Sequence, residues 1–150
     1  MATGDFDTYD HSRTILDVTA EPRWVTVRWD DGHVSRFHHL WLRDNCPCPG
    51  CVHQGTKEQT FELLSVPPTL APAGIGVGVG IVDGALRITW SGRDAHRSTY
   101  DAGWLRAHCY SDEMRARRRS SRVPWDGSTL TEPPTFDGGA VLADDDALYD

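Results

Sequence analysis

The feature that most constrains this chain is a group of three cysteines within six positions, spaced C-x-C-x2-C: Cys46, Cys48 and Cys51. A tetrahedral zinc ion with Zn–S bonds of about 2.3 Å needs sulfur atoms roughly 3.5–4 Å apart, and a loop this short can bring three of them that close. Pro47 and Pro49 restrict the backbone, and Gly50 permits a left-handed turn, so the loop loses little entropy on closing. The spacing predicts a preorganised metal site.

Two other interpretations of the cysteines were weighed against zinc. The segment Cys48–Cys51 also has the spacing of a thiol–disulfide motif, but that chemistry expects the cysteine pair at the start of a helix in a βαβ unit. No such pattern surrounds the loop. Buried or unpaired thiols without a ligand are the third interpretation. Metal binding is the one that the proline and glycine spacing favours.

Length, charge and composition limit the class of protein. A chain of 150 residues is about one domain, and its formal net charge of −7 argues against general nucleic-acid binding, which only the basic stretch 115–122 would suggest. The longest apolar run, at 74–82, is shorter than the roughly 20 residues that span a bilayer, so no membrane segment is expected. We expect no export signal at the N-terminus, and therefore a location in the reducing cytoplasm.

The order of elements predicts a small α+β fold, mainly antiparallel. Alternating β-formers at 24–29, the Asp31-Gly32 turn and 33–37 predict a β-hairpin, after a polar, mobile start at 1–12. Further strands are predicted at 60–66, before Pro67-Pro68, and at 85–90. The segment 101–119 lacks proline and ends in arginines, which predicts one helix.

An internal repeat links the two halves at an offset of 63 residues. Seven residues recur identically, and Phe37 is answered by Tyr100: Asp31, His33, Ser35, Trp41, Leu42, Arg43 and Cys46 become Asp94, His96, Ser98, Trp104, Leu105, Arg106 and Cys109. About one identity is expected by chance. The repeat predicts two packed, equivalent units with buried tryptophans at Trp41 and Trp104, and it allows the second unit to present a side chain to the metal loop of the first.

A closed zinc site needs a fourth ligand, because structural zinc is almost always four-coordinate. The chain offers five candidates outside the three-cysteine loop: His33, His53, His96, His108 and Cys109. A cysteine inside a predicted helix is as often a small buried apolar residue as a ligand. Spacing alone does not choose among the five.

The run Trp41-Leu42-Arg43-Asp44-Asn45-Cys46-Pro47-Cys48, followed by Cys51, resembles the N-terminal zinc-binding domain of the γ-butyrobetaine and trimethyllysine dioxygenase family. These are carnitine-biosynthesis hydroxylases that depend on Fe(II) and 2-oxoglutarate. The resemblance implies that the fourth ligand is a histidine in an Asp-x-His-x-Ser-x-aromatic segment after a strand ending in tryptophan. Asp94 to Tyr100, after Trp90, is similar to that segment. The resemblance therefore implies a zinc site of Cys46, Cys48, Cys51 and His96, with a longer loop between Cys51 and His96 than the family has.

The resemblance also implies a division of the chain. We expect a mobile N-terminus and first strand at 1–21, the zinc-binding domain at 22–122, and a linker with the truncated start of a catalytic domain at 123–150, where 144–149 looks like a helix opening. The family's first iron ligands come as His-x-Asp or His-x-Glu. None of the seven histidines has an acid at i+2, so this chain is expected to be inactive alone, and Fe(II), 2-oxoglutarate and ascorbate belong only to a longer parent.

Two functions follow from these expectations. The first is a zinc-binding structural and docking domain of a γ-butyrobetaine-type dioxygenase, with the catalytic domain of the same protein and a homodimer as its partners. The second is a free-standing zinc-binding adaptor or metal-handling module. A nucleic-acid-binding zinc domain is disfavoured, because basic residues at a helix end are usually a solvated face.

Overall fold

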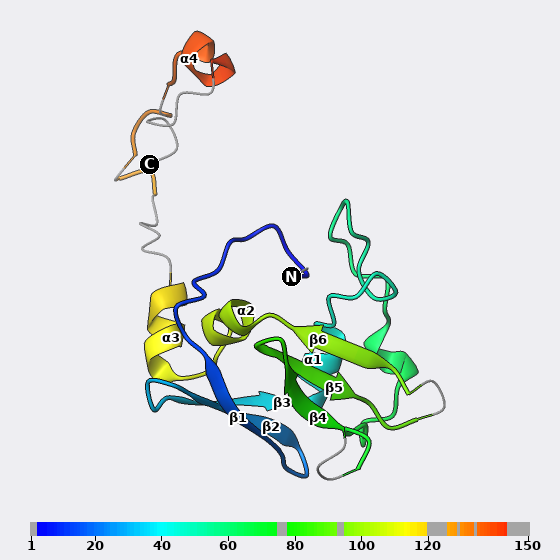
Figure 1. Ribbon diagram of the computed structural model, residues 1–150. Coiled ribbons are helices and arrows are strands. Elements are labelled where there is room, and N and C mark those ends of the chain that lie inside the picture. The colour runs from blue at the N-terminus through cyan, green and yellow to red at the C-terminus, as the bar shows by residue number, and fades with distance from the viewer. Residues whose placement is uncertain are drawn as a thin grey trace. The chain divides into compact units, whose positions relative to one another are not determined.

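The fold is that of a computed structural model, which describes residues 3–74, 78–92, 95–119, 126–128, 130–133 and 135–143. The chain divides into two compact units, 1–119 and 120–150. The described residues of the first unit form two three-stranded antiparallel sheets, three short α-helices and one 3-10 turn (Figure 1). The predicted α+β class, mainly antiparallel, is confirmed.

The first half of this unit is the sheet β1-β2-β3 followed by a short helix. Its strands are β1 (Ile15–Ala20), β2 (Trp24–Trp29) and β3 (Val34–His38). The predicted hairpin is present, and Gly32 takes a φ of 82° in its turn, a conformation that glycine adopts without strain. Helix α1 (His39–Asp44) follows β3 directly, and its first turn is capped by the His38 side chain, which accepts a hydrogen bond from the amide of Leu40.

The second half repeats this order with β4 (Val79–Val82), β5 (Ala85–Thr89), β6 (Arg97–Tyr100) and α2 (Ala102–Ala107). The strand predicted at 85–90 is confirmed as β5. Strand β4 was not predicted, although the Asp83-Gly84 pair that joins it to β5 is a strong hairpin signal. Both residues have positive φ, 52° and 76°, as that type of turn requires.

The strand pairs of the two halves match in register. Val25 pairs with Phe37 and Val27 with Ser35 in the first sheet, as Leu86 pairs with Tyr100 and Ile88 with Ser98 in the second. Beside each serine lies a buried tryptophan: Trp29 Nε1 donates to Ser35 Oγ at 2.9 Å, and Trp90 Nε1 donates to Ser98 Oγ at 2.8 Å. All of these side chains are buried in one core cluster or against it. The predicted repeat is therefore a structural duplication.

The two repeat tryptophans meet between the halves. The rings of Trp41 and Trp104 stack with centroids 5.3 Å apart and an interplanar angle of 23°. Trp104 is buried, as predicted, but Trp41 is only half-buried, and its ring also contacts the exposed Tyr110. The prediction that both tryptophans are buried is wrong for Trp41.

Two predicted elements differ from the structure. The strand predicted at 60–66 is wrong: the segment holds a single 3-10 turn, η1 (Leu63–Ser65), and Leu64 is 90 % exposed. The helix predicted over 101–119 is two helices, α2 and α3 (Asp112–Arg118). Helix α3 begins after its N-cap residue Ser111, and the Ser111 hydroxyl accepts a hydrogen bond from the amide of Met114.

The N-terminal segment crosses α2 before it enters β1 (Figure 1). Asp5 holds it there, since its carboxylate accepts hydrogen bonds from Tyr9 Oη at 2.7 Å and from Trp104 Nε1 at 3.0 Å. In the second unit the described residues include one short helix, α4 (Gly138–Leu142), capped by Asp137. Asp94, the stretch 120–125 and the helix opening predicted at 144–149 lie outside the described residues. No described helix is long and apolar enough to cross a membrane.

Candidate metal centre

The cysteine loop starts where α1 ends. Helix α1 stops at Asp44, and the chain then folds back on itself, because the amides of Cys51 and Val52 both donate to the carbonyl of Cys48, at 2.9 and 3.0 Å. Cys46 and Cys51 are buried, whereas Cys48 is half-buried. Gly50 does not take the left-handed conformation that we predicted for it, so the prolines and these hydrogen bonds shape the loop without it.

The second half delivers a histidine to this loop. His96 lies one residue before β6, where its carbonyl accepts from the amide of Trp90 at 2.8 Å. Its Nε2 lies 3.3 Å from Cys46 Sγ and 3.7 Å from both Cys48 Sγ and Cys51 Sγ. The four candidate ligand atoms all lie within 4.8 Å of one another. Three residues of one half and one of the other thus converge on a single point.

The arrangement fits zinc. In a tetrahedral site with Zn–S near 2.3 Å and Zn–N near 2.0 Å, a sulfur and a nitrogen ligand lie about 3.5 Å apart. The three sulfur–nitrogen distances here, 3.3, 3.7 and 3.7 Å, bracket that value. Three thiolates and one imidazole also form a donor set that binds soft or borderline ions in preference to calcium or magnesium.

Burial sets the charge state of the metal-free loop. It raises the pKa of Cys46 to about 12, which a hydrogen bond from Ser98 partly opposes. Burial also raises the pKa of Cys51, and Arg43 opposes that rise. Without an ion these thiols are protonated at neutral pH, so a metal that binds them as thiolates must displace protons.

Arg43 is a residue of this site that sequence reasoning did not single out. It is buried in α1, its Nη1 donates to Cys51 Sγ at 3.2 Å, and its guanidinium lies 3.5 Å from the ring centroid of Phe61. A site of three thiolates and one neutral imidazole around a divalent ion has a net charge of −1. The guanidinium beside Cys51 balances that charge.

The other four candidates for the fourth ligand lie away from the three cysteines. His33 Nε2 lies 3.2 Å from Cys109 Sγ, so those two pair with each other. His53 is exposed and its Nδ1 accepts from the amide of Thr56 at 3.1 Å. His108 stacks on Trp104 with ring centroids 4.4 Å apart.

Comparisons with known proteins agree with the motif. A family model described as "Gamma-butyrobetaine hydroxylase-like, N-terminal" matches residues 16–92, a span that includes the three cysteines and ends before His96. Gamma-butyrobetaine dioxygenase of Pseudomonas sp. (strain AK-1) is 39 % identical over 153 residues, which cover 99 % of this chain and 38 % of that protein.

Two further relatives are eukaryotic. Trimethyllysine dioxygenase of Meyerozyma guilliermondii is 36 % identical over 58 % of this chain and 21 % of its own length. Human gamma-butyrobetaine dioxygenase is 35 % identical over 83 % of this chain and 32 % of its own length. The chain therefore spans between about a fifth and two fifths of the length of these relatives.

Proposed function

The chain belongs to the gamma-butyrobetaine hydroxylase-like N-terminal family, and from this membership we propose that residues 1–119 form a structural zinc domain. Cys46, Cys48, Cys51 and His96 are its ligands. The observation that carries the proposal is the convergence of four ligand atoms from both halves within 4.8 Å. A zinc ion bound there is closed to further ligands and redox-inert, so its role is to hold structure.

The four side chains join the two sheets through one point. Cys46, Cys48 and Cys51 follow α1 of the first half, whereas His96 precedes β6 of the second. With the thiols deprotonated and the ring of His96 oriented by its place beside β6, the ligands crosslink segments 45–50 residues apart in sequence. Structural zinc contributes about 10–16 kcal/mol in small sites at neutral pH, which is comparable to the whole stability of a domain this size.

The proposal extends to the parent protein. We infer that this domain docks onto the catalytic domain of a γ-butyrobetaine-type dioxygenase of carnitine biosynthesis, a cytoplasmic homodimer that uses Fe(II), 2-oxoglutarate and ascorbate. The alignment of nearly the whole chain with the gamma-butyrobetaine dioxygenase of Pseudomonas supports this assignment. In such a protein this domain stabilises the fold and positions the catalytic domain, and the hydroxylation takes place in the catalytic domain.

Metal analysis of the purified, reduced protein tests the zinc site. We expect about one zinc per chain and loss of the near-ultraviolet tertiary signal when a chelator removes it. Cys48→Ala and His96→Ala should each lower zinc content and stability, whereas His53→Ala, a matched exposed histidine next to the same loop, should leave both unchanged. A protein that stays folded without metal would refute the structural role of zinc, and zinc loss from His53→Ala but not from His96→Ala would refute the ligand set.

A further inference from the structure

The second half of the domain contains a counterpart of the metal loop. At the offset of 63 residues, Cys46, Cys48 and Cys51 correspond to Cys109, Ser111 and Met114, and His96 corresponds to His33. Each of the two loops contains the same internal backbone hydrogen bond. The amide of Val52 donates to the carbonyl of Cys48 at 3.0 Å, and the amide of Arg115, its equivalent, donates to the carbonyl of Ser111 at 2.8 Å.

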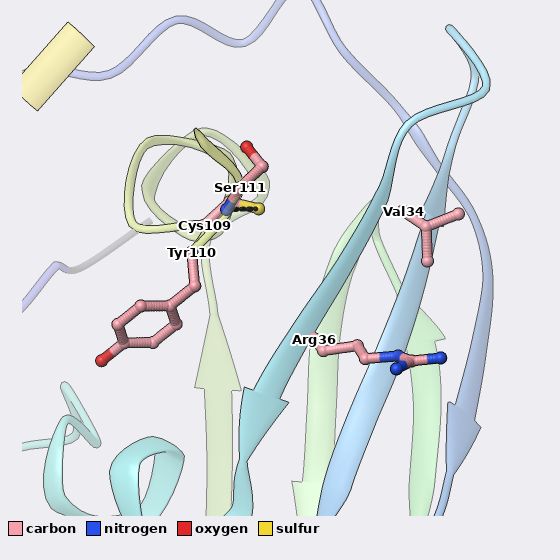
Figure 2. A pocket seen from close by; sticks show the side chains of 5 residues that line it. All are labelled: Val34, Arg36, Cys109, Tyr110 and Ser111. Carbon is pink, nitrogen blue, oxygen red and sulfur yellow. Dashed lines mark hydrogen bonds between the residues drawn. The ribbon is translucent and has the colours of Figure 1, made fainter. Parts of the chain in front are cut away.

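The histidine exchange between the halves is reciprocal. His96 of the second half lies 3.3 Å from Cys46, and His33 of the first half lies 3.2 Å from Cys109. The amide of Ser111 donates to Cys109 Sγ at 3.4 Å (Figure 2), as a backbone hydrogen bond from Cys48 reaches Cys46. Two of four ligand positions in the second loop therefore keep both the residue type and the contact found in the first.

Charged groups of both signs surround this pair. Burial lowers the pKa of His33. Among the charged groups near His33, Arg106 has the largest effect on its pKa, whereas Asp31 and Glu113 act in the opposite direction. Arg118 Nη1 donates to the carbonyl of Cys109 at 2.8 Å. Arg36 lines the same hollow, yet its guanidinium extends away from Cys109 and lies 5.6 Å from the ring centroid of Trp24 (Figure 2).

An ion has a route to Cys109. The thiol is buried at the wall of a hollow of about 390 Å³, which opens between β3 and the start of α3 (Figure 2). The hollow is lined by Val34, Arg36, Cys109, Tyr110 and Ser111. Met114, at the position equivalent to Cys51, is buried in the same core cluster as Cys109.

We propose that His33 and Cys109 form a second metal site, which binds a soft monovalent ion of the Cu(I) type. The two cysteines that would complete a zinc site are replaced by a hydroxyl at Ser111 and a thioether at Met114, and neither is a ligand that zinc selects. One thiolate and one imidazole instead suit Cu(I), which accepts fewer ligands than zinc does. The site shares no residue with Cys46, Cys48, Cys51 and His96, so a test of it does not depend on the proposed structural zinc.

Anaerobic titration of the zinc-loaded protein with Cu(I), against a chromophoric Cu(I) chelator, tests the proposal while an indicator follows released zinc. At saturation the wild type should bind about one more Cu(I) per chain than Cys109→Ser, with the same release of zinc from both. His33→Gln should weaken this additional site, because it removes the second ligand from a partly exposed position that tolerates the change. His53→Gln, which replaces an exposed histidine outside both loops, should behave like the wild type.

Equal Cu(I) uptake by the wild type, Cys109→Ser and His33→Gln would overturn the proposal. So would uptake in which every additional Cu(I) displaces zinc. A second variant keeps the test valid if Cys109→Ser does not fold. In Ser111→Cys/Met114→Cys the second loop regains three thiols beside His33, and the purified protein should contain about two zinc ions per chain where the wild type contains about one. A folded double variant that still holds a single zinc would show that the second loop is no metal framework.

Discussion

At the scale of single residues, Arg43 shows how a charged side chain can be buried at low cost. Its guanidinium is taken out of water but gains a sulfur acceptor in Cys51 and an aromatic face in Phe61. A buried cation without such partners would be strongly destabilising. In the proposed zinc site the thiolates would supply the negative charge that pairs with this guanidinium, so we expect Arg43 and the metal to stabilise each other.

Replacing Arg43 by methionine should therefore weaken zinc binding while preserving the apolar stem of the side chain. We expect the zinc affinity to fall by about 10–100-fold, the usual effect of removing a group that hydrogen-bonds a metal ligand. Competition with a chromophoric zinc chelator measures the change. The matched control is Arg106→Met, since Arg106 occupies the equivalent place in α2 but pairs with Asp31 at 2.9 Å. An equal loss of zinc affinity in both variants would contradict a specific role for Arg43.

The sequence allowed the three cysteines of the candidate site to be predicted as neighbours, because a short C-x-C-x2-C loop brings its thiols together. It did not allow a choice of the fourth ligand without the family resemblance. His33 and His96 occupy equivalent positions in the repeat, and only the three-dimensional exchange between halves pairs His96 with the cysteine loop and His33 with Cys109. The contribution of Arg43 was equally hidden, since a lone arginine in a short helix has no local signature.

At the scale of elements, the two wrong predictions have a common cause. The segment predicted as a strand at 60–66 joins neither of the two sheets, and Phe61 instead covers Arg43. The helix predicted over 101–119 is interrupted at 108–111, because the repeat imposes on it the same helix-then-loop order that follows β3. Local propensity was sufficient for the hairpin at 24–37, whose turn and alternation agree, but not where tertiary contacts decide.

Gly103 in α2 is the place where the N-terminal segment approaches a helix most closely. A Cβ built there would lie 2.7 Å from the carbonyl oxygen of Asp10 and 2.9 Å from Cβ of Tyr9. Gly103→Ala should therefore push the segment at 5–10 away from α2 and make it cleavable by low concentrations of protease. Gly80→Ala in β4 is the control, since nothing lies within 4 Å of its added Cβ. Unchanged cleavage kinetics in Gly103→Ala would show that the segment does not depend on this contact.

At the scale of the whole molecule, the stacked rings of Trp41 and Trp104 join the two halves. Trp104→Ala should lower the free energy of unfolding by about 3–5 kcal/mol, as for other buried tryptophans, and Trp41→Ala by less because its ring is half-exposed. A double-mutant cycle in urea, with zinc bound throughout, should give a coupling of about 0.5–1.5 kcal/mol for the stacked rings. Strictly additive losses would mean that the stacking contributes nothing.

The chain as a whole should not hydroxylate. Mixed with Fe(II), ascorbate, 2-oxoglutarate and γ-butyrobetaine, residues 1–150 should form no succinate above background, because none of the seven histidines is followed at i+2 by an acid that could complete the iron-binding motif. A coupled succinate assay, with a full-length dioxygenase as the positive control, measures this. Succinate formation by the chain alone would contradict this prediction, because it would require catalytic residues outside any His-x-Asp or His-x-Glu motif.

The exchange of histidines between the halves also affects how the protein is made. Cys51 and His96 are 45 residues apart, and a ribosome adds about 5–20 residues each second, so the cysteine loop is synthesised about 2–9 s before its histidine. During that interval the nascent chain has the three thiols but not His96, the proposed fourth ligand. If the proposed site captures its metal during synthesis, the first fourth ligand must be water, a cellular thiol or another histidine such as His53, which His96 later replaces.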